Sequence, residues 1–160
     1  VGDGQGAKPN RAKRCRHLAL ETLAVIGNGI LDMNQDAPES IKYHRSDRTL
    51  EITFRGEAPV SLSAELLRVL SPSAEVQGHG PGQEVLQTGK AEVGITAIEP
   101  VGHYAVQISF DDGHSSGLYT WTYLAQLASE RQILWQRYLE KLDDAGASRD
   151  PSTDIVRVIG

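Results

Sequence analysis

The sequence has little sulfur and no long apolar run. Cys15 is the only cysteine and Met33 the only methionine among 160 residues. A single cysteine excludes a disulfide within the chain and any metal site that needs two thiolates, and it is typical of a reducing compartment. No uninterrupted apolar stretch approaches the roughly 20 residues that a membrane-spanning helix needs. We therefore expect a soluble, cytoplasmic protein that does not enter a membrane.

Positive charge is also in short supply. The chain has 16 lysines and arginines against 21 aspartates and glutamates, which gives a formal net charge of -5. A chain with this balance has no overall positive field to attract a phosphate backbone or an anionic lipid surface. We therefore do not expect nucleic acid or a membrane as a partner.

Length and composition predict one globular domain with two tails. Hydrophobic residues make up 39% of the chain, which is enough for a core without disulfides or metals. We place the domain at residues 38–142, and expect disorder in residues 1–37 and in residues 143–160. Met33, where the patterned part begins, suggests a natural translation start. The alternatives are an N-terminal arm that docks, and a C-terminal strand formed by Ile155, Val156, Val158 and Ile159.

Alternating apolar residues predict several short strands. Residues 41–43 and 50–54 alternate apolar with polar side chains around the polar turn 45–48, which is typical of a hairpin. Residues 60–62 add a third strand. Residues 93–98, 104–110 and 117–119 suggest three more, and Tyr104, Val106, Ile108 and Phe110 are expected to share one face.

Two helices follow from capping residues and helical spacing. Ser63 precedes a short helix at residues 64–70, which Pro72 ends, and Thr120 precedes a long helix at about 122–142. The glycine-rich residues 77–89 are expected to form a loop. The fold class is therefore α+β, a small and mostly antiparallel sheet with one short helix and one long C-terminal helix packed on it. The apolar stripe of the long helix consists of Leu124, Leu127, Leu134, Tyr138 and Leu142.

Several consecutive stretches resemble the gamma-butyrobetaine hydroxylase-like N-terminal domain family, a domain of unknown function. The resemblance looks like the standalone bacterial form and covers about residues 38–142. It is carried by residues 65–68, 71–76, 98–102, 104–106 and 110–117, then by Tyr119, Trp121 and Leu124, and by the helix with Trp135 and Tyr138.

The resemblance implies that a metal site has been lost. In the larger dioxygenases that carry this domain, three cysteines in a Cys-Pro-Cys-x-x-Cys run and one histidine hold a zinc ion. Here Ser71, Ser73 and Val76 stand at the cysteine positions, and His114 stands at the histidine position. Structural zinc needs four nitrogen, sulfur or carboxylate ligands, so we expect no zinc and no other cofactor.

The resemblance also bears on activity and partners. The larger enzymes hold catalytic iron with a His-x-Asp/Glu pair and a distant histidine, and no such pair occurs in this sequence. Other relatives join this domain to P-loop ATPases that carry iron-sulfur clusters. The resemblance therefore implies a non-catalytic adaptor whose partner is another protein, with a P-loop iron-sulfur carrier as the candidate.

The run from Asp111 to His114 is the first candidate for a binding site. Asp111, Asp112 and His114 place two carboxylates and an imidazole in one predicted turn, where polar groups can reach a partner or a ligand. The alternative is structural, with Asp112 capping the turn while His114 packs on Tyr119 or Trp121. A small-ligand or metal site centred on His114, and an enzyme that uses His114 beside Asp112, remain further alternatives.

Arg68, Tyr119 and Trp121 complete the candidate surface. The fork of Arg68 can bind an external carboxylate, or it can pair internally with Asp111 or Asp112. Trp121 can belong to an exposed recognition patch, although large aromatic side chains more often fill the interface between sheet and helix. We predict no catalytic residue.

Overall fold

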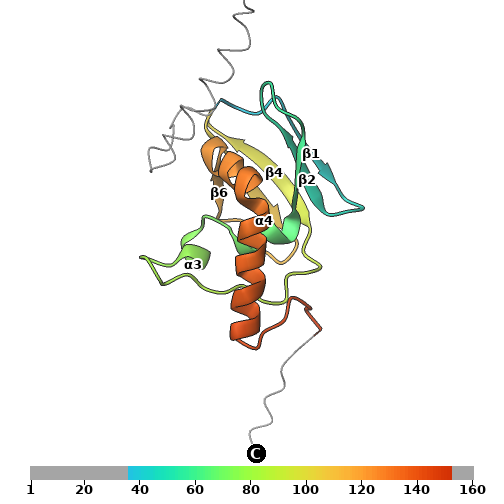
Figure 1. Ribbon diagram of the computed structural model, residues 1–160. Helices are drawn as coiled ribbons and strands as arrows, with labels where there is room; N and C mark the ends of the chain where they lie inside the picture. The colour runs from blue at the N-terminus through green and yellow to red at the C-terminus, as the bar shows by residue number, and fades with distance from the viewer. Residues whose placement is uncertain (1–35, 153–160) are drawn as a thin grey trace, which may run out of the picture. The chain divides into compact units, whose positions relative to one another are not determined.

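The computed structural model describes residues 36–152. The predictions that concern Cys15, Met33 and the apolar residues 155–159 lie outside the described residues. The elements, in chain order, are β1 (Ser40–His44), β2 (Thr49–Thr53), β3 (Val60–Ser63), α2 (Ala64–Val69), α3 (Ala74–Gln77), β4 (Ile95–Val101), β5 (Ala105–Phe110), β6 (Leu118–Thr120) and α4 (Trp121–Asp144) (Figure 1).

The strands form two antiparallel sheets of three strands each. The first has the order β1-β2-β3 and the second the order β4-β5-β6. The α+β class is therefore confirmed, but the strands form two sheets where the sequence predicted one. At the junction, the Ile95 amide donates a hydrogen bond to the Tyr43 hydroxyl at 3.0 Å. The Tyr43 side chain therefore makes a contact between β1 and β4, which are not paired by a ladder of backbone hydrogen bonds.

Both predicted helix starts have the expected caps. The Ser63 hydroxyl accepts a hydrogen bond from the Leu66 amide at 3.1 Å, and the Thr120 hydroxyl accepts one from the Tyr123 amide at the same distance. Each cap satisfies an amide that has no partner within its own helix. The two caps fix where the chain turns from β3 into α2 and from β6 into α4.

The main core lies where α2 and α4 pack on the sheets. Leu50 and Ile52 of β2, Ile108 of β5 and Leu124 of α4 are each fully buried and belong to one cluster. Figure 1 shows α4 as a long rod that crosses in front of the strands. The N-terminal half of α4 is therefore anchored in the core.

Tyr104 departs from the predicted strand pattern. It was expected to share one face with Val106, Ile108 and Phe110, but those three residues are buried whereas Tyr104 is 56% exposed. The strand begins only at Ala105, because a turn with Gly102 at φ 55° precedes it. Tyr104 belongs to that turn, where its ring lies beside Gly102.

The chain continues to pack beyond residue 142, where the sequence placed the domain boundary. After α4, the Gly89 amide donates a hydrogen bond to the Ser148 carbonyl and the Ala91 amide donates one to the Arg149 carbonyl, both at 2.9 Å. The Arg149 guanidinium makes two bonds to the Glu65 carboxylate, at 2.8 and 2.6 Å. These contacts join residues 145–152 to α2 and to residues 89–91.

Candidate functional site

His114 lies in the interior, with both ring nitrogens hydrogen-bonded. Its Nε2 atom is 2.8 Å from the Ser71 hydroxyl and 3.4 Å from the Ser73 hydroxyl, and Nδ1 is 3.0 Å from the Glu75 carboxylate. Burial lowers the pKa of His114, and the Arg68 charge lowers it further, against the opposing effect of Glu75 and Asp112. A neutral ring that donates from Nδ1 to the carboxylate must accept at Nε2. The Ser71 hydroxyl therefore donates to His114.

The order Ser71, His114, Glu75 has the connectivity of a nucleophile, a base and an orienting acid. Sequence reasoning did not find this set. Ser71 is completely buried, however, and Glu75 is 71% exposed at its side chain, so water competes for the carboxylate. The Asp112 carboxylate contacts the backbone amide of His114 rather than its ring. With no open path to Ser71, this arrangement supports a structural polar cluster.

Arg68 and Asp112 form an internal ion pair. The Arg68 Nε atom donates to Asp112 Oδ2 at 2.8 Å, and the Lys90 ammonium donates to the same oxygen at 2.6 Å. Burial by itself raises the pKa of Asp112, but the hydrogen bonds from Lys90, the His114 amide and Arg68 outweigh it and bring this pKa to about 2. The Arg68 guanidinium also donates to the Gln87 side chain at 3.1 Å. Of the two roles considered for Arg68, the geometry therefore supports internal pairing with Asp112 over binding of an external carboxylate.

The remaining candidates divide between surface and core. Asp111 is exposed and accepts a hydrogen bond from the Gly94 amide at 3.0 Å. Tyr119 is fully buried and donates to the Leu67 carbonyl at 2.7 Å, and burial raises the pKa of its hydroxyl. Trp121 is buried and donates to the His103 carbonyl at 2.7 Å. A partner-binding role for these residues stays a prediction, and only Asp111 offers its side chain freely to solvent.

The ring of His114 does not pack as the structural alternative proposed. Its aromatic contact is Phe110, with ring centroids 6.1 Å apart, and not Tyr119 or Trp121. The turn after β5 explains this, because the Phe110 amide donates to the His114 carbonyl at 2.9 Å and so brings the two residues together. The other half of that alternative holds, since Asp112 accepts from the His114 amide at 3.2 Å and caps the turn.

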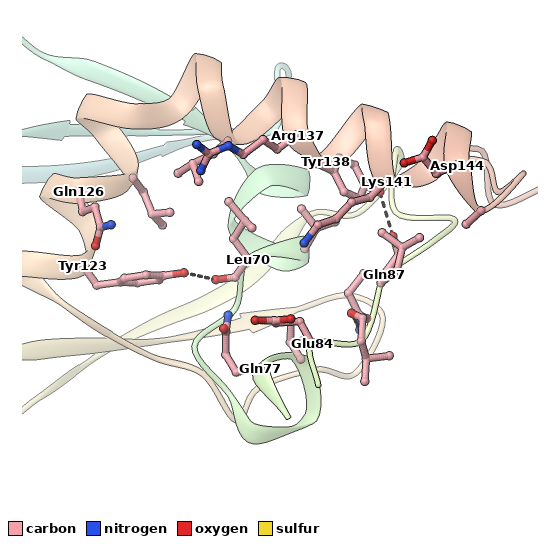
Figure 2. Close-up of a pocket in the computed structure, with 17 residues that line it drawn as sticks. Leu70, Gln77, Glu84, Gln87, Tyr123, Gln126, Arg137, Tyr138, Lys141 and Asp144 are labelled. Atoms are coloured by element: carbon pink, nitrogen blue, oxygen red, sulfur yellow. Dashed lines mark hydrogen bonds between the residues drawn. The ribbon is translucent and has the colours of Figure 1, made fainter. Parts of the chain in front are cut away.

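A groove of about 700 Å³ lies along α4. One wall consists of α4 positions between Tyr123 and Ala145, and the opposite wall of residues 69–70, 76–77 and 84–87. We call it the α4 groove. Figure 2 shows Tyr123, Gln126 and Lys141 on the helix, facing Gln77 and Glu84 across the opening. Its volume lies in the range of binding sites for small molecules and side chains.

Hydrogen bonds hold the two walls together at separate points. The Tyr123 hydroxyl donates to the Leu70 carbonyl at 2.6 Å, and the Tyr138 hydroxyl donates to the Gln87 carbonyl at 3.0 Å (Figure 2). Burial raises the pKa of both hydroxyls to about 12, so both stay protonated and able to donate. Sequence reasoning missed this groove. The available signal was the apolar pair Val85 and Leu86 inside an otherwise polar loop.

Comparison with known proteins assigns the family. The pattern of the gamma-butyrobetaine hydroxylase-like N-terminal domain matches residues 41–125. One protein solved by NMR is 49% identical and matches over 79% of this chain and 100% of its own, with a TM-score of 0.66. This chain belongs to the gamma-butyrobetaine hydroxylase-like N-terminal domain family. The predicted resemblance is thereby confirmed.

Two further solved structures are similar to this family member. A second NMR structure is 50% identical over 77% of this chain and 93% of its own, with a TM-score of 0.63. A crystal structure of a protein of unknown function from Acidithiobacillus ferrooxidans, assigned to the DUF971 family, is 36% identical over 58% of this chain and 93% of its own, with a TM-score of 0.49. No curated protein matches the chain.

The zinc site that the resemblance implies for the larger dioxygenases does not fit the residues of this chain. Ser71 and Ser73 both lie within hydrogen-bond distance of His114, but they offer neutral hydroxyls where the larger enzymes have thiolates, and Val76 offers no donor atom. Zinc sites in proteins are built from thiolate, imidazole and carboxylate ligands. Within residues 36–152, no three histidine, cysteine, aspartate or glutamate side chains are grouped to hold a metal ion. The hydrogen bonds of His114 to Ser71, Ser73 and Glu75 join the turn after β5 to residues 71–75.

Proposed function

We propose that this chain is a non-catalytic binding and adaptor domain that docks a partner protein in the α4 groove. The groove is the single observation that carries the proposal, because it is an opening between two walls that is lined in part by apolar side chains. The rest of the candidate site supports it indirectly. His114, Arg68 and Tyr119 are buried and hydrogen-bonded within the fold, so the chemistry they offer is already used internally.

The proposed setting is the cytoplasm, and the proposed partner class is a P-loop iron-sulfur carrier or another metal-cofactor protein. This part of the proposal depends on the family resemblance, which associates the domain with such ATPases. Two findings agree with it. No helix among the described residues is long and apolar enough to cross a membrane. The net charge of -5 disfavours nucleic acid as the bound partner.

Two exposed apolar residues allow a matched test. Val85 lines the groove and is 53% exposed, whereas Ile133 of α4 is 58% exposed and lies outside the groove. Because both side chains already face solvent, replacing either with glutamate should leave the fold intact. The full-length wild type, Val85→Glu and Ile133→Glu proteins are used as baits in extracts of the native cells, and bound proteins are quantified by mass spectrometry.

The expected result is a partner that the wild type and Ile133→Glu retain and that Val85→Glu loses. Circular dichroism of the three proteins checks that each is folded. If every protein retained by the wild type is retained equally by Val85→Glu, the groove is not the docking site and the proposal fails. Variants of His114 or Arg68 are poorer tests, because both side chains are buried and their removal is expected to destabilise the fold.

A further inference from the structure

The α4 groove is long and narrow, which restricts what can fill it. Its helical wall extends from Tyr123 to Ala145, and at 1.5 Å per residue this corresponds to about 33 Å. A volume of about 700 Å³ spread over such a length accommodates a row of side chains, whereas a whole helix is about 10 Å across. The shape therefore suits one face of an elongated partner segment whose backbone lies above the opening.

Apolar and polar residues both line the groove, on each of its walls. Leu127, Leu134 and Tyr138 recur at helical spacing on the α4 wall, and Leu70 and Val76 face them. Glutamines stand along both walls as well, at positions 77, 87 and 126. An acyl chain has polar atoms at one end only, so it leaves most of these side chains unmatched. An amphipathic helix presents an apolar stripe with polar flanks over its full length and matches both walls.

The α4 wall carries two cations and, near its C-terminal end, one carboxylate, Asp144. Arg137 and Lys141 are exposed on α4 one turn apart, and Glu84 lies on the opposite wall (Figure 2). Among residues 36–152, the side chains of these three residues have no hydrogen bond or ion pair with one another or with any other described residue. Their charges are therefore available to an incoming segment. The pair on α4 favours acidic residues along the flank of the partner that faces this helix.

We propose that the α4 groove binds an amphipathic helix of a partner protein, with acidic residues one turn apart that face Arg137 and Lys141. This inference rests on the proposed function and adds the chemistry of the partner to it. The apolar stripe of the partner helix fills the groove between Leu70 and Leu134. The acidic residues on its flank form ion pairs with Arg137 and Lys141. Such pairs contribute selectivity for partners more than they contribute affinity.

Synthetic helices provide the probe. Two 18-residue peptides of leucine, alanine and glutamine share one leucine stripe and differ only in carrying two glutamates or two lysines, one turn apart, on a flank of the stripe. Each is titrated into the ¹⁵N-labelled full chain while amide NMR shifts are followed. We expect the glutamate peptide to shift the amides of Leu70, Val85 and Leu134 in a saturable manner and to bind about tenfold more tightly than the lysine peptide.

Charge reversal on the protein completes the test. The double variant Arg137→Glu/Lys141→Glu should prefer the lysine peptide, while Arg55→Glu/Arg131→Glu, which changes charge equally outside the groove, should keep the preference of the wild type. Failure of both peptides to shift groove amides, or a preference unchanged by the double variant, overturns the helix proposal. Laurate, a simple acyl-chain amphiphile, is titrated in the same way. If laurate shifts the amides of the groove residues and neither peptide does, the helix proposal is overturned in favour of an amphiphile. A partner that Val85→Glu loses would then still support docking in the groove.

Discussion

Replacing Asp112 with asparagine tests the ion pair at the centre of the candidate site. The asparagine oxygen can still accept from the His114 amide, but the negative charge beside Arg68 and Lys90 is lost. The Arg68 side chain is 8% exposed, so its guanidinium would keep a buried charge without a counterion. Removing one partner of an exposed pair costs up to about 1 kcal/mol, and of a fully buried pair about 3–5 kcal/mol. We expect a loss of about 2 kcal/mol at pH 7.

The pKa of Asp112 leads to a similar magnitude and predicts a pH dependence. The fall of the Asp112 pKa from 3.8 to about 2 corresponds to about 2 kcal/mol of folding stability, at about 1.36 kcal/mol per pKa unit. Solvent screening at the exposed fifth of the side chain reduces this figure toward about 1 kcal/mol. Because the folded-state pKa is the lower one, the stabilisation is complete above pH 3.8 and is lost as the pH falls through 2. The difference between wild type and variant should therefore shrink by about half near pH 3.

Urea unfolding followed by tryptophan fluorescence measures both effects, with the m-value checking that the transition is unchanged. Asp111→Asn is the matched control, because Asp111 is adjacent and accepts only from the Gly94 amide, with no ion pair to a described residue. We expect this control to lose less than about 0.5 kcal/mol. Equal losses for the two variants, or a loss for Asp112→Asn that is the same at pH 7 and pH 3, would refute the reasoning.

Two further predictions concern the polar cluster. Because burial lowers the pKa of His114, the free energy of unfolding should fall as the pH drops below 6.5. Urea unfolding of His114→Gln between pH 7.5 and 5 should show a weaker dependence of this free energy on pH than the wild type. The same dependence in both proteins would contradict the prediction. Gly117→Ala should destabilise by about 1–3 kcal/mol, because the new methyl group would lie 2.3 Å from the Ser71 hydroxyl. Gly80→Ala, with no neighbour closer than 4.0 Å, should stay within about 0.5 kcal/mol, and equal melting temperatures for the two variants would count against this reading.

Local patterns in the sequence were enough to predict most elements of the fold. Strand alternation and the caps at Ser63 and Thr120 depend on neighbours in the chain, so they can be read from the sequence directly. The four-residue helix α3 (Ala74–Gln77) was not predicted, because it is too short for a helical period and follows Pro72 closely. Its formation depends on the packing of Val76, which only the folded structure reveals.

Contacts between distant residues account for what the sequence could not provide. The bonds between Arg149 and Glu65 join residues 84 positions apart, and nothing in either segment indicates the pairing. The same holds for the groove, whose walls come from α4 and from residues 69–87. Only the family resemblance, and not hydrophobic periodicity, connected Ser71 with His114 in the sequence. The chemistry of their contact still had to come from the structure.

The polar cluster and the groove are mechanically connected through the segment that forms the opposite wall. At one end, Ser71 is held by His114, and at the other, Gln87 is held by Arg68 and by the Tyr138 hydroxyl. Between these anchors the chain contains several glycines, which allow backbone conformations that other residues resist. Within the segment, the Val85 amide donates to the Val76 carbonyl at 2.8 Å and so connects two parts of the wall, and the anchors at its ends hold the wall against α4. The contact between Ser71 and His114 therefore helps to set the position of the wall that the proposed partner helix would touch.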